Sequence, residues 1–454
     1  MDRTGSRWLA LVVLCAGMLM IILDQTIVNV ALPAIQTDLG FSQSSLAWVV
    51  NAYLIAFGGL LLLAGRLGDL VGRKRVFIAG LTVFTAASVL CGVSGGPAML
   101  VAARFLQGAG AALTSSVILG MVVAMFADPA ERARAIGVYS SVAAAGASIG
   151  LLAGGFITQA LSWHWIFFVN VPIGVGAAAL AARLLDRDAG IGRRGGADLP
   201  GAVLVTSGLM LGVYTIVGAD GHGWLSAPTL GFGAASLALL VAFVVRQATA
   251  ARPLLPLRVL RARNLAGANV VQMLMIAGLF GMFFLSLLYL QRVLGYDAVR
   301  IGLAFLPVAL AIGTLSLGFS ARLNARFGAR NVLLAGLGLV AAGLVLLVGV
   351  PVDGRYVADL LPALLLLGVG GGLSFPALMT LAMSSATPAD AGLDSGLVNT
   401  TQQVGGAVGL AVLATLASGR TAALRATGSD EAAALLGGYH LAFGVAAAFG
   451  VGAI

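Results

Sequence analysis

The sequence predicts an all-α polytopic membrane protein with about fourteen transmembrane helices, because it is apolar, poor in charge and divided into long apolar segments. Hydrophobic residues make up 60% of its 454 positions and charged residues 9%, whereas about a quarter of the residues of a soluble domain are charged. The apolar segments are roughly 18–25 residues long, the length that a helix needs to cross ~30 Å of hydrocarbon. Helices also satisfy their own backbone hydrogen bonds in lipid, which excludes an open sheet.

The predicted helices follow one another along the whole chain. The first comes after Arg3 and Arg7 and is longer than the apolar core of a cleaved signal peptide, so we expect it to stay in the protein. The last reaches Ile454 without a polar tail, and the sequence leaves open whether that helix is complete. The predicted spans are 8–33, 46–65, 76–95, 98–126, 134–158, 165–184, 199–218, 227–245, 265–290, 301–320, 331–350, 357–384, 393–418 and 437–454.

The positive charges fall mainly on one side of the predicted membrane. Of the 26 lysines and arginines, 20 lie at the N-terminus and in alternate loops, 5 lie in the other loops, and Arg104 lies inside a span. Positively charged loops stay in the cytoplasm, so we expect both termini to be cytoplasmic and the protein to lie in the cell (plasma) membrane. The net charge of +9 is spread over these loops, which argues against a nucleic-acid partner.

A faint internal duplication divides the chain into two halves. The loop GRLGDLVGRKRV at 65–76 shares Arg, Leu, Gly and Val with ARLNARFGARNV at 321–332, an offset of 256, and glycines of the fourth and fifth spans recur near this offset. The duplication predicts two six-helix lobes, 8–184 and 265–454, and a linker at 185–264 that carries two extra helices. Internal repeats of membrane helices are typical of secondary transporters, whose substrate site lies between the halves.

One acidic residue, Asp24, lies inside the first predicted span, in the segment LDQTIVNVALP at 23–33. A charged side chain costs at least ~2.5–3.5 kcal/mol at the centre of a bilayer, so Asp24 must face the protein interior or a watery cavity. Desolvation favours the neutral form of a carboxyl group, which predicts a proton- or cation-binding site. The alternative is a structural carboxylate that pairs with a nearby cation.

Arg104, in the segment RFLQGAG, is the candidate cation. Counted from the outer ends of their helices, the depths of Asp24 and Arg104 differ by roughly 5 Å at 1.5 Å per residue, so the two side chains can meet. An opposing guanidinium favours the ionised carboxylate, whereas desolvation opposes it, and the sequence does not decide between the two effects.

The loop that follows the second span combines turn glycines with charges of both signs. A topology anchor would explain the basic residues, but it would not explain the acid or the glycines. An acid at a helix end can pair with a basic group or a helix N-terminus of a neighbouring helix, and such a contact would form a gate if it broke and re-formed between conformations. The predicted gating loop comprises Gly65, Asp69, Gly72, Arg73 and Lys74.

A stripe of glycines marks the fifth span. Gly146, Gly150 and Gly154 recur at four-residue spacing, with Gly155 beside them. Small residues allow close helix–helix contact in lipid. A tight contact that can slide is also what an alternating-access hinge requires.

These motifs, together with WHWIFFVNVPIG at 163–174, resemble the major facilitator superfamily over essentially the whole chain. Specifically, they resemble its fourteen-span drug:proton antiporters. The resemblance implies that Asp24 and Arg104 take part in proton coupling, that the loop at 65–75 steadies the two-lobed conformations, and that the glycine stripe is the antiporter motif. One departure is that Leu151 follows Gly150 where the family has a proline.

The resemblance implies a secondary active transporter that exports lipophilic molecules, cationic drugs or antibiotics among them, in exchange for protons by alternating access. We expect an apolar substrate cavity with a few polar points. The candidate lining residues are Gln25, Asn29, Asn51, Tyr53, Gln107, Phe283, Phe284 and Gln402.

We expect the proton gradient to supply the energy, with no cofactor. Cys15 and Cys91 lie apart in apolar spans and the histidines are scattered, so we expect no metal site and no disulfide. The expected partners are small lipophilic substrates and the lipid bilayer, without nucleic acid, and we expect a monomer.

Several alternatives stay open. The protein could export a single metabolite, or work inward as a permease, and a membrane sensor is a remote alternative. An enzyme would need clustered catalytic side chains in the spans or a sizeable soluble domain, and the sequence has neither. Whether Asp24 binds the proton, the drug or both also stays open.

Overall fold

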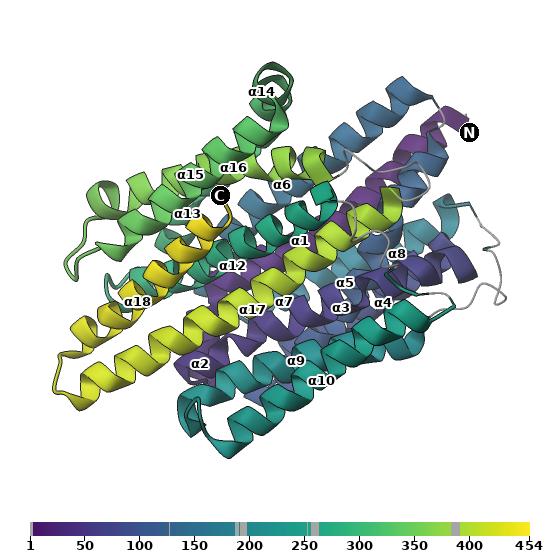
Figure 1. Ribbon diagram of the computed structural model, residues 1–454. Helices are drawn as coiled ribbons and strands as arrows, with labels where there is room; N and C mark the ends of the chain where they lie inside the picture. The colour runs from purple at the N-terminus through teal and green to yellow at the C-terminus, as the bar shows by residue number, and fades with distance from the viewer. Residues whose placement is uncertain are drawn as a thin grey trace.

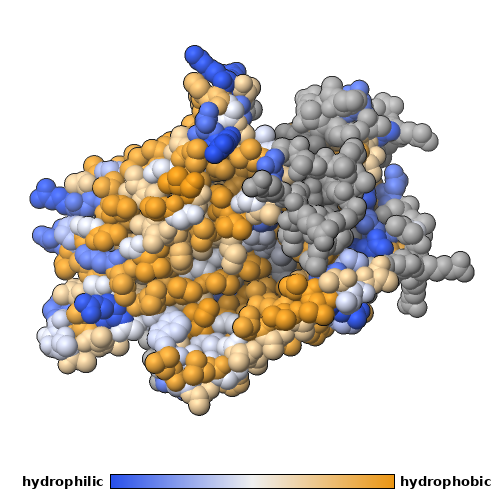
Figure 2. Space-filling view, in the orientation of Figure 1, coloured by the Kyte–Doolittle hydropathy of each residue, from blue (hydrophilic) through white to orange (hydrophobic). Residues whose placement is uncertain are grey.

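The described residues form a bundle of helices. The computed structural model describes residues 3–126, 128–186, 190, 198–251, 253–255, 263–382 and 391–454, and these residues contain no strand. The long helices run side by side (Figure 1). Figure 2 shows hydrophobic residues over the flanks of the bundle and hydrophilic residues toward its ends and on one projecting helix, as expected for a protein surrounded by lipid.

The described residues of the first half form eight helical segments, which are followed by a hairpin of two long helices. The first-half segments are α1 (Arg3–Leu39), α2 (Gln43–Leu46), α3 (Trp48–Val71), α4 (Arg73–Gly92), α5 (Pro97–Met125), α6 (Pro129–Ala160), α7 (Trp165–Phe168) and α8 (Asn170–Leu184). The hairpin helices are α9 (Leu199–His222) and α10 (Ala227–Thr249).

In the described residues the second half contains six long helices, one short helix and two π-helical turns. Its elements are α12 (Arg263–Arg292), α13 (Ala298–Thr314), η2 (Leu315–Phe319), α14 (Ser320–Phe327), α15 (Ala329–Val348), η3 (Tyr356–Leu360), α16 (Leu361–Ala382), α17 (Ala391–Ala426) and α18 (Glu431–Gly452).

Twelve helices of the described part are long and apolar enough to cross a membrane. Two of the fourteen predicted spans are not among them. The span 134–158 lies in α6, many of whose side chains fall outside the described part, and the span 301–320 lies in α13, a shorter apolar helix that continues through η2. The helical membrane fold is therefore confirmed, whereas the count of fourteen is not.

The predicted end of the first span is wrong. The prediction ends this span at Pro33, but α1 continues through Pro33 to Leu39. Proline ends a helix in water, whereas a membrane helix tolerates it because neighbouring groups satisfy the freed backbone carbonyl. The last helix likewise begins at Glu431, six residues before the predicted start at 437.

Glycines at corresponding places in the two halves make the same kind of helix contact. Where α5 crosses α4, a Cβ on Gly110 would lie 2.5 Å from a backbone nitrogen; where α16 crosses α15, a Cβ on Gly370 would lie 2.6 Å from a backbone oxygen. The turns that precede α4 and α15 match as well, since Gly72 and Gly328 both have positive φ, 101° and 80°. Glycine alone fits such positions without strain, which explains why it recurs at a nearly constant offset.

The hairpin of α9 and α10 lies at one edge of the bundle (Figure 1). Its helix α9 packs on α3 and α17, and α10 packs on α9. Asp198, whose side chain is 1% exposed, caps α9 and accepts hydrogen bonds from Arg246 Nε and Gln247 Nε2, both at 2.9 Å. Burial raises the pKa of Asp198, but the hydrogen bonds from Gln247 and Arg246 outweigh it and hold the pKa below its usual value.

Candidate functional site

Asp24 and Arg104 form a buried ion pair inside the first half of the chain. Asp24 comes from α1 and Arg104 from α5, and Nη1 of Arg104 lies 2.5 Å from Oδ2 of Asp24. The two residues are 0% and 1% exposed. The contact between Asp24 and Arg104 that the sequence allows is therefore made.

Two side-chain amides complete the surroundings of the carboxylate. Nε2 of Gln107 donates to Oδ1 of Asp24 at 2.7 Å, and Nδ2 of Asn170 donates to the same oxygen at 3.0 Å. Together with Arg104, three donors point at one carboxylate, and hydrogen bonds to an ionised group are about twice as strong as neutral ones. A proton that bound to Asp24 would replace at least one of these contacts.

Arg104 is itself fixed from several sides. Its Nε donates to the carbonyl of Val49 in α3 at 2.9 Å, and its Nη1 also donates to Oε1 of Gln107 at 2.6 Å. The ring of Tyr53 lies over the guanidinium, with 4.3 Å between Cζ and the ring centroid. The guanidinium is planar, carries several donors and can stack on a ring, so it can satisfy all these contacts, whereas the ammonium group of lysine cannot.

A second feature is a cavity of about 240 Å³ between the two halves. The first half contributes Thr26 and Asn29 from α1 and Val50 from α3. The second half contributes mainly apolar and aromatic side chains from α12, α13, α16 and α17. Asp24 does not line this cavity, although it lies only two residues from Thr26 on the same helix.

The predicted lining residues divide into two groups. Four of the eight line the cavity, namely Asn29, Phe283, Phe284 and Gln402. Tyr53 and Gln107 do not, because they point into the first half and contact Arg104. Gln25 and Asn51 are also not among the lining residues, and Asn51 is fully buried in α3.

The predicted gating loop comprises the end of α3, Gly72 and the start of α4. Gly72 ends one helix and precedes the next, whereas Gly65 lies within α3, where a Cβ would meet only a side-chain carbon at 3.9 Å. Asp69 pairs with Arg73 of the same loop at 3.4 Å, with both side chains more than a third exposed. Arg73 also donates to a carbonyl of α5 at 3.0 Å, and Lys74 donates to a carbonyl of α8 at 2.8 Å. These bonds join the loop to helices of its own half, and its role as a gate stays a prediction.

The glycine stripe is the contact surface of α6. A Cβ on Gly146, Gly150 or Gly154 would lie 2.9, 1.9 or 2.9 Å from the nearest atom of α1. A Cβ on Gly155 would lie 2.6 Å from the carbonyl oxygen of Ala298 in α13, which belongs to the second half. The stripe therefore allows α6 to approach a helix of each half closely.

At the end of the bundle opposite the N-terminus, a further contact joins the two halves. Nη2 of Arg292 in α12 donates to Oε1 of Gln36 in α1, and Nε2 of Gln36 donates to the carbonyl of Phe41 at 3.0 Å. Gln36 is buried. Arg292 lies just beyond the predicted span 265–290, and Gln36 is not among the predicted site residues.

The protein-family model for the Major Facilitator Superfamily matches residues 14–410 of this chain. These residues include the ion pair, the cavity and the glycine stripe. The chain belongs to the major facilitator superfamily. This membership identifies it as a multi-pass membrane transporter rather than an enzyme, and it confirms the resemblance at the level of the superfamily.

The relatives of this major facilitator protein include proteins that are named for antibiotics. It is 41% identical over 450 residues to a puromycin resistance protein of Streptomyces alboniger, covering 99% of this chain and 89% of that one. It is 40% identical over 425 residues to a cephamycin export protein of Amycolatopsis lactamdurans, covering 92% and 87%. In fold it resembles a bacterial homologue of the human lysosomal transporter Spinster, with a TM-score of 0.71 at 15% identity, covering 99% and 95% of the two chains.

Two polar residues of this major facilitator site, Asn170 and Ser88, are not among the predicted site residues. Asn170 contacts Asp24, and Ser88 Oγ accepts a hydrogen bond from Gln107 at 2.9 Å. Asn170 is the only side-chain amide in WHWIFFVNVPIG, which is a signal that could have found it. Ser88 gave no such signal, because a serine can bond to its own helix; its Oγ donates to the carbonyl of Phe84 at 2.8 Å.

Proposed function

We propose that this transporter exports lipophilic drugs or antibiotics in exchange for protons, by alternating access, as a member of the drug:proton antiporters. The buried pair of Asp24 and Arg104 carries the proposal, since ionisable groups inside membrane spans mark ion pathways and proton relays. The relatives named for puromycin resistance and cephamycin export support antibiotics as the cargo.

In this proposal Asp24 binds the proton, and the cavity between the two halves (the interlobe cavity) binds the drug. The donors around Asp24 all come from the first half, and the carboxylate does not line the cavity. The lining of the cavity is mainly apolar, with Asn29 and Gln402 as polar points, which suits a lipophilic molecule. The two sites would therefore communicate through α1, which carries both Asp24 and Asn29.

Protonation of Asp24 would remove one charge of its pair with Arg104. The loss of this attraction would free α1 to move against α6, along the surface made by Gly146, Gly150 and Gly154. Movement of α1 would change the cavity wall and would also strain the contact between Gln36 and Arg292. A change at the proton site would in this way open one side of the cavity or the other.

The proposed architecture has fourteen spans, with α6 and α13 crossing the membrane together with the twelve helices already counted. The two six-helix lobes would comprise 8–184 and 265–454, with the hairpin in the linker at 185–264. Both termini would lie in the cytoplasm, beneath the plasma membrane, because the loops at that end carry most of the positive charge. The protein would work as a monomer, with the proton gradient as its energy source and without a cofactor.

Growth and vesicle assays together test this function. Expression in a host that lacks its own efflux pumps should protect it against puromycin, a cephamycin or other antibiotics, lipophilic ones among them. In inverted vesicles, addition of the protective compound should dissipate a preformed pH gradient. Asp24→Asn should abolish both effects at equal abundance in the membrane, and wild-type behaviour of Asp24→Asn would exclude the proposed coupling.

A dedicated exporter of one compound is the second candidate, because each of the two relatives is named for a single antibiotic. The same growth panel distinguishes the candidates. Protection against several unrelated drugs indicates a multidrug exporter, whereas protection against one compound indicates a dedicated exporter. Increased sensitivity to a drug would instead indicate an inward permease.

A further inference from the structure

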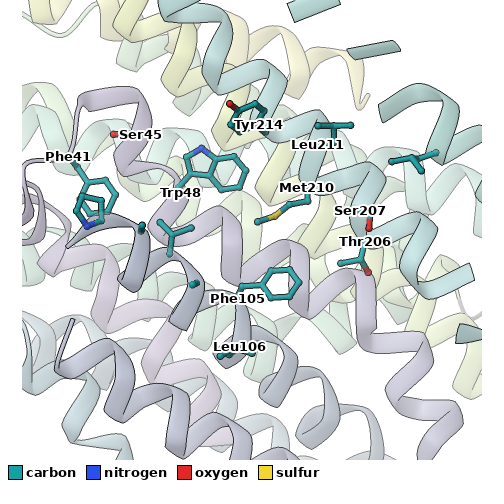
Figure 3. Close-up of a pocket in the computed structure, with 15 residues that line it drawn as sticks. Phe41, Ser45, Trp48, Phe105, Leu106, Thr206, Ser207, Met210, Leu211 and Tyr214 are labelled. Carbon is teal, nitrogen blue, oxygen red and sulfur yellow. The ribbon is translucent and has the colours of Figure 1, made fainter. Parts of the chain in front are cut away.

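A large groove lies away from both the ion pair and the interlobe cavity. Its volume is about 1100 Å³, and its walls come mainly from α5 and from the hairpin helix α9, with the start of α3 at one end. Figure 3 shows the side chains of Trp48, Phe105 and Met210 lying around this space, from α3, α5 and α9 respectively. On α5, Ala102 and Phe105 line the groove, whereas Arg104 and Gln107 belong to the cluster around Asp24.

The groove is continuous with the surface that faces the lipid. Two of its lining residues, Leu106 and Tyr214, are 46% and 50% exposed. The neighbouring helix α10 is exposed along most of its length, and only 11% of the residues in its most apolar stretch are buried. Figure 2 shows hydrophobic surface over this hairpin. The material at the mouth of the groove in a membrane is therefore hydrocarbon.

Water and empty space are poor occupants of this groove. A buried water molecule needs two to four polar partners, and the lining offers only separate hydroxyl groups, such as those of Ser45 and Ser207, among apolar side chains. An empty groove would leave its side chains without dispersion contacts on one side. A flexible hydrocarbon chain satisfies both conditions, and Met210 is a side chain that adapts to such a partner.

The outer end of the groove differs from its deeper part. At the end near the predicted outer surface it is lined by Ser45 and Trp48, and tryptophan prefers the level of the lipid headgroups. Toward the middle of the bundle it is lined by Phe105 and by Met210, which lies midway along α9, with the hydroxyl groups of residues 206–207 deeper on the same helix. The tryptophan at the outer end, above a mainly apolar stretch, matches a lipid whose headgroup is at the outer surface and whose chain points inward.

We propose that the groove between α5 and α9 holds one acyl chain of a phospholipid from the outer leaflet. The chain fills the space between the hairpin and the first half, and α9 otherwise packs on α3, α10 and α17. The site is distinct from the interlobe cavity, and the proposal requires only that the protein lies in a membrane.

Photoreactive lipids test this site in the full-length protein. The protein is reconstituted in phosphatidylglycerol vesicles that contain a small share of phosphatidylcholine with a diazirine on one acyl chain, irradiated, and analysed by mass spectrometry of its peptides. A diazirine near the headgroup should label the segment around Ser45 and Trp48. A diazirine at the end of the chain should label the segments around Phe105 and Met210, and the reverse order would overturn the proposed orientation.

Filling the groove provides the decisive comparison. Ala102→Trp places a large side chain in the groove, and Val241→Trp places the same side chain on the exposed face of α10, outside the groove. Labelling of the groove segments should be lost in the first variant and unchanged in the second. If Ala102→Trp does not fold, Ser207→Trp tests the opposite wall.

Two results would overturn the proposal. Equal labelling of the groove in both variants would show only the mobile lipid that surrounds any membrane protein. Absence of label from the groove in the unmodified protein would show that no chain enters it.

Discussion

Gly150→Ala adds one methyl group where α6 approaches α1 most closely within the glycine stripe. The added Cβ would lie 1.9 Å from Oγ1 of Thr26, 3.0 Å from its Cβ and 3.1 Å from the carbonyl oxygen of Leu23. Rotation of the Thr26 side chain would remove only the first of these clashes, because the other two involve a Cβ and the backbone. Since carbon atoms pack at about 3.5–4.0 Å, the helices must separate by at least ~0.5 Å.

We expect Gly150→Ala to lower the free energy of unfolding by about 1–3 kcal/mol, the usual range for overpacking. Drug exchange should slow as well, because the proposed movement of α1 follows the same surface. Thermal unfolding of the purified protein measures the first effect, and drug-driven proton flux in vesicles measures the second. Thr26→Ala in the Gly150→Ala background should restore part of the stability, since it removes the closest atom.

Gly444→Ala in α18 is the matched control, because a Cβ there would meet no atom within 4 Å. We expect it to change the free energy of unfolding by no more than ~0.5 kcal/mol. If Gly150→Ala were as stable and as active as Gly444→Ala, the close contact between α1 and α6 would have no role in stability or transport.

Three further substitutions test separate parts of the account. Asn170→Leu should lower the free energy of unfolding by about 1.5–3 kcal/mol, since it removes a hydrogen bond to a charged group, and an unchanged thermal midpoint would contradict this. The pKa of Asp198 is below its usual value, so its ionised form stabilises the protein at every pH above the usual pKa. This contribution is lost as the pH falls through the lowered pKa. Asp198→Asn should therefore destabilise the protein near neutral pH but not in strong acid, and an equal effect at both would be inconsistent with the shift. Gln36→Ala removes the acceptor of Arg292, so an impermeant maleimide added from outside should label a Gln402→Cys protein faster, and an unchanged rate would exclude this contact as a closure.

The sequence predicted the charged centre of the site well, for a physical reason. Charges are so unfavourable inside a membrane that Asp24 and Arg104 stood out from their apolar segments. Their meeting at 2.5 Å could not be deduced, because it depends on how α1 and α5 rotate and pack. Glycine gave a similar signal, since the close contacts at Gly110 and Gly370 require the absence of a side chain.

The remaining features depended on packing that leaves little trace in one sequence. Tyr53 and Gln107 are polar residues in apolar spans, as Asn29 and Gln402 are, but only the fold decides which of them contact Arg104 and which line the cavity. The continuation of α1 beyond Pro33 similarly depends on the neighbouring helices.

The claim that Asp24 carries the exchanged proton can be tested most directly by measuring proton release when the drug binds. The purified transporter is mixed, in a weakly buffered solution with a pH indicator, with the compound that the growth panel identifies. The account predicts that the wild-type protein releases protons on binding, and that Asp24→Asn binds the compound without releasing them. Equal proton release by both proteins would contradict the central role of Asp24.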